Sequence, residues 1–176
     1  MESFIKNPVV RFLFWASVGY LIWLMIYYLY IKTHTNWDYY LDYSIVYLSQ
    51  SLFDVLGIAT TIEIESDHVI LLMDGVANTG VWVGDECNGF KLFSIFTIFI
   101  LAFPGNWKTK AWYIPVGILL IHFANIIRVM ALLTIYEKWP EFLDFNHNYT
   151  FTIFVYSIIF ILWIRWAKKY GHVKKA

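Results

Sequence analysis

Long apolar segments constrain the fold of this chain more than any other feature. A helix needs about 20 apolar residues to cross the roughly 30 Å hydrocarbon core of a bilayer. We expect four membrane-spanning helices, at residues 12–31, 88–104, 112–135 and 149–166. With 60% hydrophobic and 15% charged residues, the chain is too apolar for a soluble domain of this size. The first apolar run is longer than a signal-peptide core, so we expect it to be retained.

The basic residues predict the orientation of these spans. Most of them fall before the first span, between the second and third, or at and after the end of the last: Lys6, Arg11, Lys108, Lys110, Arg165, Lys168, Lys169, Lys174 and Lys175. The positive-inside rule makes these segments, and therefore both termini, cytoplasmic. Two termini on one side require an even number of crossings. The apolar run 39–57, which carries Asp42, Gln50 and Asp54, is therefore expected to lie on the outer surface or to re-enter as an amphipathic segment.

A β-type pattern occupies residues 58–84. Residues 60–65 alternate between polar and apolar side chains, 68–73 and 80–83 form further short apolar runs, and Asp74 and Gly75 indicate a turn. Open strand edges are not tolerated in lipid, so this stretch is expected on the outer face, as a cap or as a connecting loop. The sequence thus predicts one all-α membrane domain over residues 1–176, a four-helix bundle whose outer-face segment 39–86 holds an amphipathic helix and a small β-type cap.

Three polar residues are predicted to share one membrane depth. Cys87, the only cysteine, precedes the span 88–104, and His147 precedes the outer end of the last span. Between Trp112 and Arg128 the third span rises about 24 Å, at roughly 1.5 Å per residue, so the guanidinium can reach the outer boundary. Alone, the cysteine is typical of a small buried hydrophobe and the histidine of a helix start. An arginine at this depth indicates function, because its charge must be paired or face a cavity.

Four further residues are candidate supporting groups: Asn125, Lys91, Asn88 and Glu86. Asn125 lies three residues before Arg128, close enough to brace the guanidinium. Lys91 either extends to the interface or favours the thiolate of Cys87, whereas Glu86 disfavours the thiolate. The sequence leaves open which effect dominates.

The three principal residues suit thiol acyl transfer. A thiolate is the attacking form of cysteine, an imidazole can carry protons between nucleophile and leaving group, and guanidinium N–H groups can stabilise an oxyanion. Arg128 cannot act as a base, because it does not deprotonate at accessible pH. The sequence contains no paired-cysteine, HExxH or P-loop motif. We therefore expect no metal, no cofactor and no nucleic-acid partner.

Three separated motifs carry a family resemblance. The segment 85–90 (DECNGF) before an apolar helix, Asn125 to Val129 late in the next helix, and His147 at the start of the last resemble the exosortase/archaeosortase family of membrane cysteine transpeptidases. The resemblance covers roughly residues 80–165. It implies cleavage of exported proteins that end in a short motif, an apolar helix and a basic tail, at the outer face of a bacterial plasma membrane. It also implies Cys87 as nucleophile, Arg128 as transition-state stabiliser and His147 as the proton-transfer residue.

The chain departs from the family pattern in two ways. Many members have more membrane helices, and many have a serine where this chain has Asn88. These departures leave open the substrate motif and whether a partner subunit or a second copy completes the substrate groove. Two other classes of function remain alternatives: a non-catalytic membrane assembly or partner subunit, and an envelope acyltransferase that uses the same cysteine.

Overall fold

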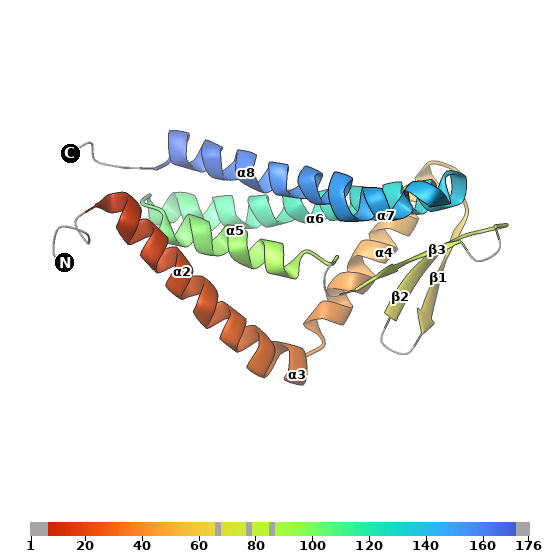
Figure 1. Ribbon diagram of the computed structural model, residues 1–176, viewed down its shortest axis with the longest axis horizontal. Helices are drawn as coiled ribbons and strands as arrows, with labels where there is room; N and C mark the ends of the chain where they lie inside the picture. The colour runs from red at the N-terminus through yellow and green to blue at the C-terminus, as the bar shows by residue number, and fades with distance from the viewer. Residues whose placement is uncertain (1–6, 66–67, 77–78, 85–86, 172–176) are drawn as a thin grey trace.

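The computed structural model describes residues 7–65, 68–76, 79–84 and 87–171 of the chain. Its elements, in order, are α2 (Pro8–Ile26), η1 (Tyr27–Ile31), α3 (Lys32–His34), α4 (Trp37–Val55), β1 (Thr60–Glu65), β2 (His68–Met73), β3 (Gly80–Val83), α5 (Phe90–Ala102), α6 (Trp107–Lys138), η2 (Pro140–Phe142), α7 (Leu143–Phe145), η3 (Asn146–Thr150) and α8 (Phe151–Lys169). Helix α5 packs against α2, α6 and α8. The described ends of the chain lie at the end remote from the sheet (Figure 1). The mostly helical class is confirmed.

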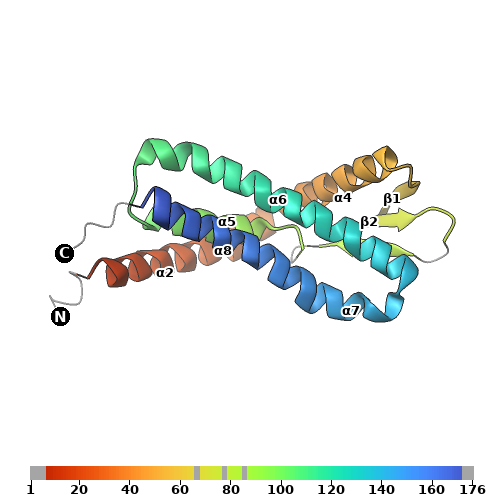
Figure 2. The same cartoon turned by 90° about the horizontal axis from the view of Figure 1, so that it is seen from above.

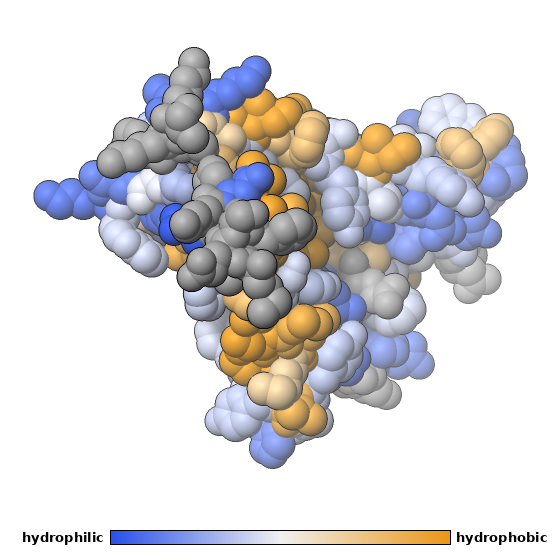
Figure 3. Space-filling view, turned by 60° about the vertical axis from the view of Figure 1, so that its left-hand side comes forward, coloured by the Kyte–Doolittle hydropathy of each residue, from blue (hydrophilic) through white to orange (hydrophobic). Residues whose placement is uncertain are grey.

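In the described part of the chain, three helical stretches are long and apolar enough to cross a membrane. They are Val9–His34, Trp107–Lys138 and Pro140–Lys169, and they contain the predicted spans 12–31, 112–135 and 149–166. Their outer surfaces carry large exposed apolar side chains, such as Leu29 and Leu119, as expected of helices that face lipid. Figure 3 shows one face on which such apolar groups, in orange, gather.

The predicted span 88–104 is a shorter helix than expected. Helix α5 has 13 residues and begins at Phe90, because Gly89 adopts a left-handed conformation with φ of 82°. It ends before Pro104, whose ring disfavours helical geometry at the preceding residue; Phe103 is extended, with ψ of 139°. An α-helix of this length rises only about 20 Å. The expected count of four crossings therefore stays a prediction.

The β-type pattern forms a three-stranded antiparallel sheet in the order β1-β2-β3. All three strands have the bounds expected from the sequence, with Ile62 opposite Leu71 and Val69 opposite Val83. Alternation buries Val69, Leu71 and Met73 on one face, where they share an apolar core with residues of α4 and α6. The sheet is confirmed, whereas its place on the outer face of a membrane stays a prediction.

The run 39–57 is a helix, α4, that packs against the sheet and α6. It is not one of the three stretches apolar enough to span, in agreement with the expected amphipathic segment. Viewed from above, α4 lies beside the sheet and beyond α5 (Figure 2). Helix α6 has 32 residues, which corresponds to about 48 Å, so it is long enough to pack on α5 and also reach the sheet.

A second core joins α5, α6 and α8. Its fully buried members include Phe96, Ile121, Ile159 and Trp166. The ring of Phe96 lies directly against Gly117 on α6. It occupies the space that a Cβ atom of residue 117 would fill. The close approach of α5 and α6 therefore depends on the absence of a side chain at this position.

We expect Gly117→Ala to lower the melting temperature of the detergent-solubilised protein. Alanine improves helix propensity by up to about 1 kcal/mol, but overpacking a buried ring costs about 1–3 kcal/mol, so the clash outweighs the gain. Val116→Ala, on the neighbouring exposed position, is the control and should change the melting temperature less. A Gly117→Ala protein as stable as the parent would contradict the packing described here.

Candidate active site

Cys87 lies in a tight turn between β3 and α5. Its backbone N–H donates to the Gly84 carbonyl oxygen at 2.7 Å, and the N–H of Asn88 donates to the same oxygen at 3.2 Å. The sequence predicted Cys87 at the start of a helix, but the left-handed Gly89 separates the two, and the first helical residue is Phe90. The cysteine therefore projects from a turn that is fixed by backbone hydrogen bonds.

Asn88 fixes this turn from inside the protein. It is fully buried, and its Oδ1 accepts the N–H of Phe90 at 2.9 Å, an N-terminal helix interaction that side-chain oxygens favour. Its Nδ2 donates to Oδ1 of Asp38, at the start of α4, at 2.8 Å. The other oxygen of Asp38 accepts the hydroxyl of Tyr27 at 3.0 Å. The cysteine turn is thus connected to α4 and to η1.

Cys87 and His147 are in direct contact. The Cys87 Sγ and the His147 Nε2 are 3.4 Å apart. His147 comes from η3, a π-helical turn inside the otherwise continuous helical stretch that ends in α8. Such turns are rare and frequently occur at functional sites. The convergence that the shared depth predicted for these two residues is confirmed.

Arg128 reaches the same place from α6. Its Nη2 lies 3.5 Å from the backbone carbonyl oxygen of His147, which also accepts the Thr152 hydroxyl at 3.4 Å. The side chain is 7% exposed, and its Nε is buried without a hydrogen-bond partner in the described part of the chain. Arg128 therefore lies beside His147 and has one buried N–H that no described group accepts.

One cavity of about 330 Å³ unites these residues. Its lining includes Cys87, Lys91, Arg128, His147 and Tyr156. Two of these side chains are cations, and none of the described residues that line the cavity is a carboxylate. The Nζ of Lys91 also lies 6.0 Å from the centre of the Tyr27 ring. Lys91 and Arg128 each favour a thiolate or a developing oxyanion in this cavity.

Asn125 supports the site differently from the expectation. Both polar atoms of its side chain are buried and have no hydrogen-bond partner among the described residues, so no bond to Arg128 forms. Its amide instead lies against Gly89 and occupies the position that a Cβ atom of residue 89 would take. Asn125 therefore bears on the conformation of the cysteine turn. The last supporting candidate, Glu86, falls outside the described residues.

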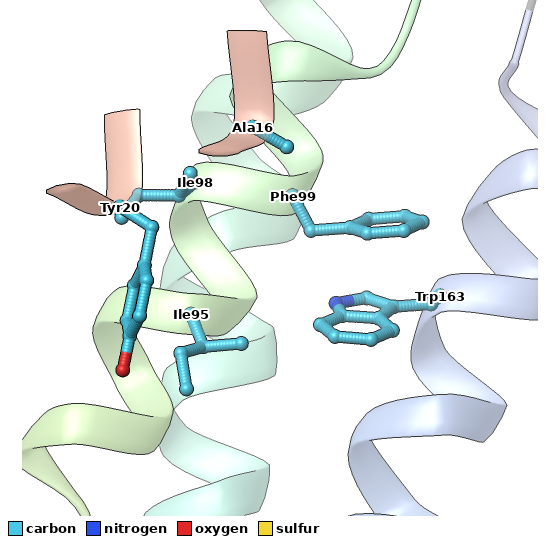
Figure 4. A pocket seen from close by; sticks show the side chains of 6 residues that line it. All are labelled: Ala16, Tyr20, Ile95, Ile98, Phe99 and Trp163. Carbon is cyan, nitrogen blue, oxygen red and sulfur yellow. The ribbon is translucent and has the colours of Figure 1, made fainter. Parts of the chain in front are cut away.

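A second pocket lies among α2, α5 and α8, away from the polar cavity. It measures about 280 Å³ and is lined by six residues: Ala16, Tyr20, Ile95, Ile98, Phe99 and Trp163. Figure 4 shows Trp163 beneath Phe99, and their rings stack with centroids 4.2 Å apart. None of these side chains is a nucleophile or a general base at neutral pH. This pocket therefore offers no group for acyl transfer.

Comparison with known protein families decides the family of the chain. The transmembrane exosortase family matches residues 8–167, which is most of the 176-residue chain. The chain belongs to the transmembrane exosortase family. This assignment makes the protein a membrane protein and implies, at the level of the family, a cysteine transpeptidase. The comparisons match this exosortase to no curated protein and to no solved structure.

The sequence missed two residues of the site in this exosortase. Asp38 and Tyr27 lie far along the chain from Asn88, and nothing in the local pattern pairs them. Asn88 is predicted as a supporting residue and as a departure from the family pattern, but the sequence gives no partner for it. The one signal for this contact in the sequence is the position of Asp38 in the first turn of α4. An acidic residue there is also explained by the positive end of the helix dipole.

We expect Gly89→Ala to slow the alkylation of Cys87 by iodoacetamide. The substitution places a Cβ in a left-handed residue, a strain of about 1–2 kcal/mol, and drives it into the Asn125 amide. Gly57→Ala is the matched control, because Gly57 has φ of 74° but open space around its Cβ position. Equal alkylation rates for the two variants would show that Asn125 does not constrain the turn.

Asp38 and Asn88 should be energetically coupled. In a double-mutant cycle with Asp38→Ala and Asn88→Ala, we expect a coupling of about 0.5–3 kcal/mol in the free energy of unfolding in detergent. Asp54→Ala, at the exposed far end of α4, serves as the control. Its effect on the free energy of unfolding and that of Asn88→Ala should be additive within about 0.5 kcal/mol. Additive effects of Asp38→Ala and Asn88→Ala would contradict the hydrogen bond between them.

Proposed function

We propose that this exosortase is a membrane thiol peptidase or transpeptidase that cleaves C-terminal sorting tails of exported proteins through a Cys87 acyl-enzyme. The observation that carries the proposal is the 3.4 Å contact between the Cys87 Sγ and the His147 Nε2, beside Arg128 in one cavity. A nucleophile in hydrogen-bond reach of a base is the arrangement that covalent catalysis requires.

The first half of the reaction forms a thioester. His147 takes the proton of the Cys87 thiol, and the thiolate attacks the carbonyl carbon of the scissile peptide bond. The guanidinium of Arg128 stabilises the resulting oxyanion, which is the role left to a cation that cannot lose its proton. As the carbon–nitrogen bond breaks, His147 returns its proton to the leaving amine. The tail is released, and the rest of the substrate stays on Sγ as a thioester.

The second half restores the thiol. A water molecule or an amine attacks the thioester carbonyl and passes its proton to His147, and the returning proton neutralises the departing thiolate. Water gives hydrolysis and an amine gives transfer, so both outcomes use the same three residues. The 3.5 Å approach of the Arg128 guanidinium to the His147 carbonyl oxygen holds the oxyanion donor beside the base throughout.

We place the cavity at the outer face of the bacterial plasma membrane and both termini in the cytoplasm. Two observations support this orientation. The basic residues gather near the described ends of the chain and in the connection that leads into α6, whose first residues include Lys108 and Lys110. Those ends lie on the side of the molecule remote from the sheet (Figure 1). An outward-facing thiol can meet proteins that remain tethered by an apolar tail after export.

The decisive variants change one group each. We expect Cys87→Ala and His147→Ala to stop the size change of tail-bearing proteins in membranes, because each removes a reacting group. Arg128→Lys keeps the charge but loses the planar fork of donors, and should slow processing by about 10²–10³-fold, the cost of one oxyanion donor. His34→Ala, an exposed histidine on α3, should process normally.

The assay follows a candidate substrate by immunoblot in membranes of cells that co-express each variant. Unchanged processing by Cys87→Ala, at equal protein levels, would rule out the peptidase proposal.

A further inference from the structure

We propose that the free edge of β3 binds the substrate as an added, fourth strand that leads its scissile bond to Cys87. The ligand is an extended polypeptide segment of the substrate, recognised mainly through its backbone. The inference rests on the proposed function, because it names how the substrate of the same cavity is held. Strand addition to a sheet edge is a general mode of peptide recognition.

The register identifies the backbone groups at this edge. The N–H of Met73 donates to the carbonyl oxygen of Thr79 at 3.0 Å, which makes this pair a hydrogen-bonded one. Such pairs recur at every second residue of an antiparallel ladder, so Val81 and Val83 bond toward β2. The N–H and C=O groups of Gly80 and Trp82 therefore point away from β2. In the described part of the chain, β3 pairs with no other strand.

The two edges of the sheet differ in how they resist pairing. Natural edge strands are protected by charged residues or proline. Strand β1 carries Glu63 and Glu65, whereas β3 has the sequence GVWV, with neither charge nor proline. The β3 edge thus lacks the charges that β1 carries, as an edge that accepts a strand would.

The position of β3 matches this task. The strand ends at Val83, the carbonyl of Gly84 anchors the turn, and Cys87 follows directly. Helices α4 and α6 cover one face of the sheet, where Val83 is fully buried, and leave Trp82 57% exposed on the other. In Figure 1, β3 lies at the end of the molecule where α7 is labelled, and it packs against α6. A peptide paired with β3 therefore extends toward the cavity between Cys87 and His147.

An extended backbone is the occupant that this edge fits. The outward N–H and C=O groups of Gly80 and Trp82 are complementary to the backbone of a β-strand. They do not fit a helix, because its backbone groups are already hydrogen-bonded. Peptide-bond cleavage also needs the scissile carbonyl presented in a fixed register, and strand pairing supplies that register independently of side chains. The exposed Trp82 indole adds an apolar contact for a substrate side chain.

The first test replaces Trp82 by proline. Trp82→Pro removes an outward N–H without breaking a bond to β2, and proline is tolerated at such edge positions. The reporter ends in the C-terminal tail of a protein whose unprocessed form accumulates in Cys87→Ala membranes. We expect Trp82→Pro to process it about tenfold more slowly, the effect of roughly one lost hydrogen bond. Alkylation of Cys87 by iodoacetamide should stay unchanged.

Two controls separate the backbone from the side chain and from the sheet. Trp82→Ala keeps the N–H and should slow processing less than Trp82→Pro. Ile64→Pro removes an outward N–H from β1, the other edge, and should process the reporter normally. Equal processing by Trp82→Pro and Ile64→Pro overturns the proposal.

A proline scan of the reporter tests the inference without altering the enzyme. Proline is placed at successive positions on the N-terminal side of the cleavage site. A paired strand gives intolerance at every second position, because alternate N–H groups face β3. Intolerance without this period overturns strand pairing. If Cys87→Ala leaves processing unchanged, the proposed function itself fails. If Cys87→Ala is inactive but Trp82→Pro processes the reporter normally, only the strand-pairing inference fails.

Discussion

A bilayer offers no partner for an open backbone hydrogen bond, and this constraint arranges the whole molecule. The apolar segments satisfy their backbone groups internally as helices. The strands, with two edges, lie with α4 at one end of the long helix α6. The site forms where the apolar helices meet the sheet. One cavity there is lined by the turn after β3, by α6 and by the start of α8.

The cysteine turn is held by polar contacts that reach across the fold. Asn88 connects it to Asp38 on α4, and Asn125 on α6 lies against Gly89. These contacts lie in the protein interior, where a missing partner costs more than the bond itself contributes. The residues around the nucleophile are therefore as much a part of the site as the three groups that face the cavity.

The sequence predicted much of this arrangement, for identifiable reasons. Strand bounds followed from alternation in residues 60–65 and from two short apolar runs. The meeting of Cys87 with His147 followed from their positions before the outer ends of two spans. The start of α5 was wrong, because it depends on the left-handed Gly89, and sequence did not show which glycine takes that form. The bridge from Asn88 to Asp38 could not be predicted, since it joins residues 50 apart in sequence.

The most direct test of the central claim is mass spectrometry of the peptide that carries Cys87, taken from protein purified with its substrate under conditions that slow turnover. We predict a polypeptide fragment attached to Sγ through a thioester, which hydroxylamine releases. The fragment should end at the cleaved bond and lack the tail. A Cys87 thiol that stays unmodified while the substrate is processed, or one that carries a lipid acyl chain instead, would contradict the account.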